Sequence, residues 1–420
     1  MATNRDALFT RDPLTGRTAG LVDQTGLVTP IGSYASPAVL FNLFGTENNS
    51  GQTVGASDVI MDAQIPAMAP FYGVKLVYAN YNTAAAMTMD GAKVAPTAVD
   101  LTAAGNTLSW SSFVTFSGSQ TATVPQAKTG AGGQIVPGIA VSDFVPVTSI
   151  ARTDVVGAPY LLRVRSHVLA NSIAFSIGGT HGATLNAASF NPGLKYANYN
   201  PVDTLANLTT NVSSTLSPSS AIEPIAVIFF YSSSVESLAA FGDSVIQGAG
   251  SATSHFAGPA DRLTFLSYGT SRQISAASFA SSGQTTLDSN ATLKNYINAG
   301  ATPTYVLFKS WSVNDGLTQA LVDKSWASVV DTLEFLRQKS ITPVLLTAPP
   351  TSGVPWAMIK VVNARVMALP AWVVKVDVAT ALNDPSNDGN LRAVYDSGDH
   401  THPTDAANLL MAQMILAALR

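Results

Sequence analysis

From about residue 235 onwards, short apolar runs alternate with segments of helical periodicity, and this feature constrains the fold more than any other. Five runs have strand character: 238–241, 273–279, 304–308, 342–346 and 372–376. The clearest helical pattern covers 317–339, and a last helix is expected over 404–419. Strand–helix alternation predicts a parallel sheet with helices on both faces. Functional residues of such sheets lie at the carboxyl ends of the strands.

The chain before residue 235 has a different pattern. Apolar runs at 73–78, 112–116 and 160–165 alternate with turns rich in Gly, Ser, Thr and Asn. This period-2 pattern predicts an all-β sandwich or barrel. The segment 203–220 is expected to be a loop with a short helix. We therefore divide the chain into an N-terminal arm (1–30), a β domain (31–234) and an α/β domain (235–420). The arm either wraps its own domain or mounts the protein on a partner.

Composition excludes several classes of function. The chain has 22 Lys and Arg against 26 Asp and Glu, a net charge of −4, and no basic run, which argues against a nucleic-acid partner. It has no Cys, so disulfides and thiolate chemistry are excluded. The longest apolar stretch, 225–231, is far shorter than the roughly 20 residues of a membrane span. No apolar segment follows the polar first residues, so no signal peptide is expected.

Three of the expected strands end in residues that can act together. Gly242-Asp243-Ser244 follows the first strand, and a serine at a strand-to-helix turn exposes its hydroxyl and its own N–H. Gly283 follows the second strand and can present a bare N–H. Asn314 follows the third and can donate from its side-chain amide. Taken alone, each signal is more typical of an ordinary turn.

The last expected strand is followed by a segment with two of the five histidines, His400 and His402. Asp399 precedes His402 by three residues and can accept the second ring N–H of a general base. His400 is the rival base, but it is adjacent to Asp399. A metal site formed by these histidines with Asp396 or Asp399 is the alternative, although no second cluster of ligands is evident.

The order Ser244, Gly283, Asn314-Asp315, then Asp399 and His402-Pro403 resembles the SGNH (GDSL) hydrolase family over residues 235–420. Ala348-Pro349-Pro350 is also similar to the family's loop after the fourth strand. Two positions depart from the pattern: Ser312 replaces the usual glycine before Asn314, and Val245-Ile246 follow the serine. The resemblance implies a flavodoxin-like three-layer α/β/α sandwich with a five-stranded parallel sheet. Short motifs upstream resemble the jelly-roll-like domain that precedes some bacterial esterases of this family.

The resemblance implies a serine esterase with Ser244 as nucleophile, His402 as base and Asp399 as its orienting acid. Ser244, Gly283 and Asn314 would form the oxyanion hole. No metal or organic cofactor is implied. The expected substrate is an acyl ester, most simply an acetyl ester on a carbohydrate. A lipase for small or lipidic esters and a non-enzymatic adhesion module with a decayed hydrolase domain are the alternatives.

The sequence gives weaker indications about several other residues and about the location and assembly of the protein. Trp311 and Trp356 lie near strand-end loops and either pack in the core or line an acyl or sugar pocket. His167, His181 and His255 are expected to be structural or surface residues, and Asp243 a structural hydrogen-bonding residue. The N-terminal arm and low charge resemble phage tail-associated proteins. This likeness would suit an extracellular or virion-associated protein and a trimeric assembly.

Overall fold

The computed structural model describes most of the second half of the chain and much of the first. The described residues are 58–99, 108–154, 160–170, 205–209, 224–251 and 258–419, with short strands at 9–11, 18–22, 28–29, 35–38, 52–53, 173–174 and 195–198. His181 and His255 lie outside these residues, as does most of the segment 203–220.

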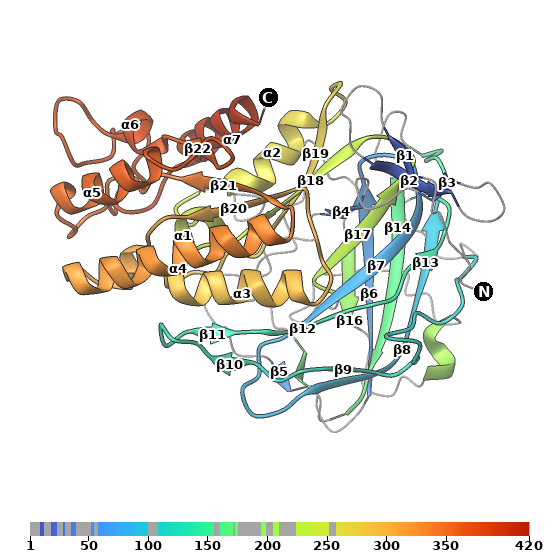
Figure 1. Ribbon diagram of the computed structural model, residues 1–420. Coiled ribbons are helices and arrows are strands. Elements are labelled where there is room, and N and C mark those ends of the chain that lie inside the picture. The colour runs from blue at the N-terminus through green and yellow to red at the C-terminus, as the bar shows by residue number, and fades with distance from the viewer. Residues whose placement is uncertain are drawn as a thin grey trace, which may run out of the picture.

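A five-stranded parallel sheet forms the centre of the C-terminal part (Figure 1). Its strands are β18 (Val235–Ala240), β19 (Gln273–Ser278), β20 (Tyr305–Lys309), β21 (Thr342–Leu346) and β22 (Val374–Val376). They are arranged in the order β19-β18-β20-β21-β22, and each neighbouring pair is parallel. Numbered along the chain this is 2-1-3-4-5, the flavodoxin-like order. The predicted α/β fold class is confirmed.

Helices cover both faces of this sheet (Figure 1). Alternate strand residues pack on opposite sides, as period-2 geometry requires. Val306 and Phe308 share one core cluster with α3 and α4, while Leu307 shares another with α2 and α7. The helices are α1 (Ser244–Gln247), α2 (Pro259–Ser267), α3 (Thr286–Asn298), α4 (Gln319–Gln338), α5 (Trp356–Met367), α6 (Val378–Leu382) and α7 (Asp405–Ala418), with 3-10 turns η1 (Leu205–Leu208) and η2 (Val313–Asp315).

Antiparallel sheets make up the described N-terminal part. One has the order β12-β7-β17-β4, with β13 also paired to β7, and the other has the order β16-β6-β14-β8-β9. Their strands are β4 (Ala35–Ala38), β6 (Val59–Ala67), β7 (Phe71–Asn80), β8 (Met87–Thr97), β9 (Ala122–Val124), β12 (Gly138–Val141), β13 (Val145–Pro146), β14 (Tyr160–Val168), β16 (Lys195–Asn198) and β17 (Ala226–Tyr231). The jelly-roll connectivity stays a prediction, since much of the linking chain lies outside the described residues.

Smaller sheets complete the N-terminal part. Within the predicted arm, β1 (Phe9–Arg11), β2 (Thr18–Val22) and β3 (Val28–Thr29) form a three-stranded antiparallel sheet. Two-stranded sheets are formed by β5 (Gln52–Thr53) with β15 (Ile173–Ala174), and by β10 (Lys128–Thr129) with β11 (Ile135–Val136). The strand expected at 112–116 is wrong. Ser111 and Val114 each donate one backbone hydrogen bond to β8, but no continuous ladder forms there.

The N-terminal and C-terminal parts share a core. One cluster of buried apolar side chains includes Val77 and Phe229 of an antiparallel sheet together with Phe241 and Val306 of the parallel sheet. The predicted boundary at residue 235 falls at the first residue of β18. Among the described residues, no helix combines the length and the hydropathy needed to cross a bilayer.

Candidate active site

Ser244 lies at the carboxyl end of β18, where the chain turns into α1. Asp243 is the N-cap of this short helix, and its Oδ1 accepts the N–H of Val245 at 3.0 Å. Ser244 is the first helical residue, so its N–H has no acceptor within the helix. The Ser244 residue is only 5% exposed. The turn therefore holds the hydroxyl in one place at the edge of the sheet.

His402 comes from the loop before α7 and reaches the same edge. Its Nε2 lies 2.9 Å from Ser244 Oγ, and its Nδ1 lies 2.5 Å from Asp399 Oδ2. The N–H of His402 also donates to Asp399 Oδ1 at 2.8 Å. Partial burial raises the pKa of the Asp399 carboxyl, but the bonds from the ring and backbone of His402, from Thr401 N–H and from Ser397 Oγ outweigh it and hold the pKa well below its usual range. An ionised Asp399 fixes the imidazole with Nδ1 protonated and Nε2 as acceptor.

Gly250, just after α1, allows the histidine loop to approach. Its φ is +88°, and a Cβ at this position would lie 2.6 Å from His402 Cβ and 3.0 Å from Ser397 Cβ. Any side chain here would therefore be strained and would displace His402 from Ser244. No local sequence signal distinguishes this glycine from one in an ordinary turn. It stands six residues after the serine, and only the folded chain brings it against the histidine.

His400 has a different partner from His402. Its Nδ1 pairs with Asp396 Oδ2, and its N–H donates to Asp396 Oδ1 at 2.9 Å. The His400 side chain is 66% exposed and its φ is +60°, which is uncommon for a residue with a side chain. The geometry therefore joins His402, not His400, to Ser244.

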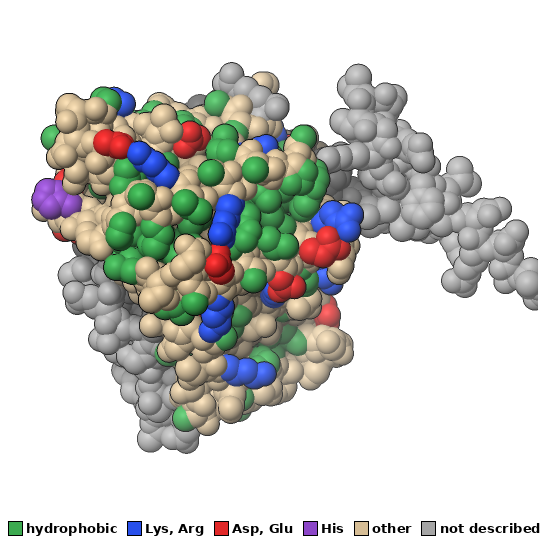
Figure 2. Space-filling view, turned by 60° about the vertical axis from the view of Figure 1, so that its left-hand side comes forward, with side chains coloured by type: hydrophobic (Ala, Val, Ile, Leu, Met, Phe, Trp, Pro, Cys, Tyr) green, Lys and Arg blue, Asp and Glu red, His purple; other side chains and the backbone are tan. Residues whose placement is uncertain are grey.

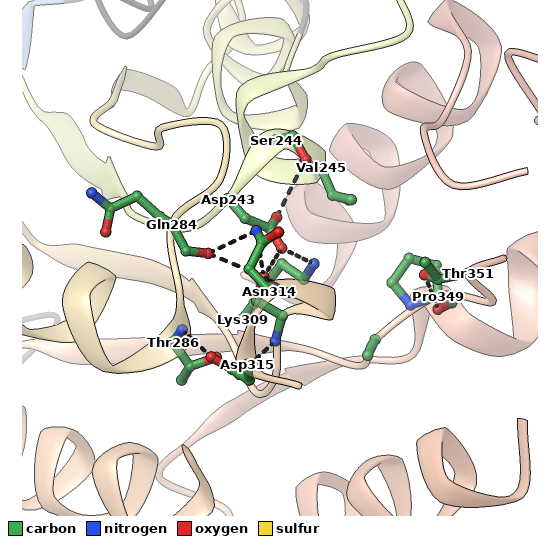
Figure 3. A network of polar contacts seen from close by, with 12 residues as sticks. Asp243, Ser244, Val245, Gln284, Thr286, Lys309, Asn314, Asp315, Pro349 and Thr351 are labelled. Atoms are coloured by element: carbon green, nitrogen blue, oxygen red, sulfur yellow. Dashed lines mark hydrogen bonds and ion pairs between the residues drawn. The ribbon is translucent and has the colours of Figure 1, made fainter. Parts of the chain in front are cut away.

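The predicted oxyanion donors lie on neighbouring loops, but they differ in their surroundings. Gly283 has φ +79°, and a Cβ added there would meet open space. The Asn314 Nδ2 group instead donates to Gln284 O at 3.0 Å and to Ser312 Oγ at 3.1 Å (Figure 3). Both amide hydrogens thus have protein acceptors. Contact with a substrate oxygen requires Asn314 to exchange one of these bonds.

A buried ion pair lies behind the serine. Lys309 Nζ at the end of β20 is 2.7 Å from Asp243 Oδ2, with side-chain exposures of 7% and 1% (Figure 3). Ser312 Oγ donates to the same Asp243 oxygen at 2.6 Å. Asp315 Oδ1 and Oδ2 accept the N–H and hydroxyl of Thr286, each at 2.6 Å, which joins η2 to the start of α3. Burial raises the pKa of the Asp315 carboxyl, although these bonds oppose the shift.

A hairpin from the N-terminal part also contacts this site. The β10–β11 hairpin places Gly132 N–H and Gln134 N–H 2.8 and 3.0 Å from the two carboxylate oxygens of Asp288, which is fully buried in α3. Gln284 Nε2 donates to Ile135 O at 2.9 Å. A Cβ on Gly132 would lie 2.0 Å from Thr285 Oγ1, so only glycine permits this approach. The glycine run within residues 128–136 is typical of any turn, so the sequence alone does not reveal this contact.

The remaining residues named from the sequence have other environments. Trp311 is 2% exposed and packs in the core. Trp356 is half-buried and lines a separate cleft. His167 is buried, with its Nδ1 2.5 Å from Asp90. In the described part of the chain, no group of three or more His, Asp or Glu side chains is arranged to hold a metal.

Comparisons with known proteins give partial likenesses. The chain matches no protein-family model and no curated protein sequence. The solved structures that are similar to part of it include a GDSL-like lipase from Bacteroides thetaiotaomicron, which is 19% identical with a TM-score of 0.35; the match covers 43% of this chain and 86% of that one.

Two esterase structures give similar values. A psychrotrophic esterase from Pseudoalteromonas is 16% identical with a TM-score of 0.34, over 43% of this chain and 95% of that one. A variant of an acetyl xylan esterase from Geobacillus stearothermophilus is 17% identical with a TM-score of 0.35, over 44% of this chain and 94% of that one.

Proposed function

We propose that the protein is a serine esterase that hydrolyses acyl esters, most simply acetyl esters on a carbohydrate, through an acyl-enzyme. The observation that carries this proposal is the 2.9 Å contact of His402 Nε2 with Ser244 Oγ, together with the carboxylate of Asp399 on the opposite ring nitrogen. A hydroxyl, an imidazole and an ionised carboxylate in this order form an activated nucleophile.

Each residue has a defined part in the proposed reaction. His402 Nε2 takes the Ser244 proton as Oγ attacks the acyl carbonyl, and Asp399 stabilises the imidazolium that results. The Ser244 and Gly283 N–H groups, with Asn314, donate to the oxyanion. The imidazolium then gives its proton to the leaving alcohol, and the acyl-enzyme forms. Water, activated by the same imidazole, releases the acid and restores Ser244.

The small acyl group is supported by the side chains near the serine. The loops that end β19 and β20 are rich in Ser, Thr and Gln and contain no long apolar run. Loops of this composition are also compatible with a sugar as the alcohol. Charged side chains on the face seen in Figure 2 are scattered singly or in opposite-sign pairs among apolar and uncharged groups.

Two measurements test the proposal. A fluorophosphonate probe should label wild-type protein at Ser244, as mapped by mass spectrometry, because it reacts with an activated serine whatever the natural substrate is. Hydrolysis of p-nitrophenyl esters from acetate to octanoate should be fastest for acetate and should fall at least about 10⁴-fold in Ser244→Ala. Ser271→Ala is the matched control, because Ser271 is exposed at the opposite edge of the sheet, just before β19.

The outcomes separate the alternatives. Faster hydrolysis of octanoate than of acetate would favour a lipase for longer acyl chains. If Ser244 is not labelled and no ester is turned over in a Ser244-dependent way, the esterase proposal is wrong and the non-enzymatic module is favoured.

A further inference from the structure

A cleft opens at the carboxyl edge of the parallel sheet, and none of the residues assigned to the candidate active site lines it. It has a volume of about 330 Å³ and lies between α5, α6 and the turn at 383–389. The side chains that give it its chemistry are Trp356, Lys360, Asn363, Asp377, Thr380 and Asp388. Both helices lie at the end of the molecule reached by the carboxyl ends of β21 and β22 (Figure 1). A space of this size accommodates one or two sugar rings.

The aromatic wall of the cleft is held in place by its neighbours. Trp356 Nε1 donates to Asp388 Oδ1 at 2.7 Å, and Asn383 Nδ2 donates to the same oxygen at 3.0 Å. A Cβ on Gly389 would lie 2.9 Å from Trp356 Cβ, so the backbone of the turn packs directly against the tryptophan. Because the indole is fixed before any ligand arrives, little side-chain entropy is lost on binding.

The charges of the cleft point to a neutral ligand. Lys360 Nζ lies 2.8 Å from Asp388 Oδ2, and this bond holds the pKa of the Asp388 carboxyl below its usual range. The same ammonium group lies over the Trp356 ring, 5.6 Å from its centre, so a sugar ring on that face must displace the lysine. Asp377 caps α6 and accepts from Thr380 Oγ1 at 2.7 Å. One lysine against two carboxylates leaves a slight negative charge, which disfavours an anionic ligand, and both carboxylates already have partners. The Asn363 amide is already bonded to Ala348 through both its oxygen and its nitrogen, at 2.8 and 2.9 Å. The further lone pairs of the two carboxylates and the further hydrogens of the Lys360 ammonium group are the positions to which neutral hydroxyls can bond.

We propose that this cleft binds a neutral oligosaccharide, with the apolar face of one sugar ring against Trp356. Carbon-bound hydrogens of a sugar ring pack on an aromatic side chain, while its hydroxyls bond to the carboxylates and the ammonium group at the rim. The binding itself does not depend on the esterase reaction. Its use as a substrate-binding subsite rests on the proposed function.

The cleft is connected to the loop of His402. Ser352 N–H donates to His400 O at 2.7 Å, and the segment from Ser352 to Pro355 leads directly into α5, whose first residue is Trp356. The walls of the cleft and the histidine loop are therefore held together.

The test is titration calorimetry of the full chain with unacetylated xylohexaose, mannohexaose, cellohexaose and hexagalacturonate. These ligands carry no ester, so binding is measured without turnover. We expect at least one neutral hexasaccharide to bind and hexagalacturonate to bind at least about tenfold more weakly. Trp356→Ala should weaken binding about tenfold or more, equivalent to about 1.4 kcal/mol. Trp372→Ala is its control, since Trp372 is 41% exposed and does not line the cleft.

A second pair of variants guards against loss of folding. Ala364 is an exposed residue of α5 that lines the cleft, so the longer side chain of Ala364→Arg should block the cleft. The helix should be preserved, because arginine is a good helix former. Ala357→Arg is the control on the same helix, exposed but outside the lining. Binding that survives Ala364→Arg, tighter binding of hexagalacturonate, or no binding of any neutral hexasaccharide at millimolar concentration would overturn the proposal. If the probe labels Ser244 but no sugar binds, only the sugar-binding proposal is refuted. If sugar binds but Ser244 is not labelled, only the esterase proposal is refuted.

Discussion

Asp288→Asn tests the contact between the two parts of the chain. The Asp288 carboxylate is fully buried and accepts Gly132 N–H, Gln134 N–H and Thr285 Oγ1–H, at 2.8, 3.0 and 2.8 Å. Asparagine has nearly the same shape, but one carboxylate oxygen becomes an NH₂ group that faces a donor. At least one hydrogen bond is lost, and the charge that strengthens the others disappears.

The expected cost follows from these bonds. A hydrogen bond to a charged group contributes about 1.5–3 kcal/mol. The hairpin backbone is half-exposed, so water can replace part of the lost bond, and the estimate lies near the lower end. We expect Asp288→Asn to lower the free energy of unfolding by about 2 kcal/mol. Gly132→Ala should cost a similar amount, because its Cβ would meet Thr285 Oγ1 at 2.0 Å.

Urea unfolding followed by circular dichroism measures this change as a lower midpoint at constant m-value. Asp331→Asn is the matched control. The Asp331 side chain is 74% exposed in its ion pair with Lys294, and an exposed pair contributes only about 0–1 kcal/mol. Equal midpoints for the two variants, or a free energy of unfolding for Asp288→Asn within about 0.5 kcal/mol of wild type, would refute the idea that the hairpin is anchored by this carboxylate.

Three further predictions concern single residues. His402→Ala should abolish hydrolysis of p-nitrophenyl acetate, while His400→Ala should keep its rate within about threefold, because only His402 contacts Ser244; the reverse result would contradict the assignment. Gly250→Ala should lower kcat about tenfold or more with a smaller change in KM, since its Cβ would lie 2.6 Å from His402 Cβ; steady-state kinetics at equal folded fraction measures this. Burial raises the pKa of Asp261 from 3.8 to about 7, so the native state holds more protons than the unfolded state between these values. Stability should therefore fall as the pH rises from about 4 to about 7, by up to about 4 kcal/mol, and Asp261→Asn should remove that slope in urea titrations.

The α/β fold could be predicted because its signals are local. The runs of β19, β20 and β21 are apolar and short, and α4 and α7 have caps at Thr318 and Thr404 just before their periodic residues. For most of these elements, the predicted and observed boundaries differ by one or two residues. The alternating apolar pattern at 112–116 predicts a strand that does not form. Such a pattern does not show whether a neighbouring strand pairs with the segment along its whole length.

The approach of distant segments could not be predicted in the same way. Ser244 and Asn314 each follow an expected strand closely, so parallel strand order brings them to one edge. His402 is separated from β22 by α6 and a long loop, so strand order alone does not place it there. The contact of Gly132 with Asp288 joins positions 156 residues apart, and nothing near either residue names the other. The same holds for Gly250 beside His402. A glycine required by a close approach has the same sequence appearance as a glycine in a free turn.

The hydroxyl of Ser312 supports two buried groups of the candidate site. Lys309 and Asp243 form an ion pair that is almost fully removed from water, and such a pair is favourable only when further hydrogen bonds satisfy its atoms. Ser312 Oγ donates one of these bonds, to Asp243 Oδ2, and accepts from Asn314 Nδ2. A glycine in place of Ser312 would remove a donor from the Asp243 carboxylate that caps α1, and would leave one Asn314 hydrogen without an acceptor. The serine at 312 thus supports the buried Lys309 pair and ties the Asn314 amide to the turn of Ser244.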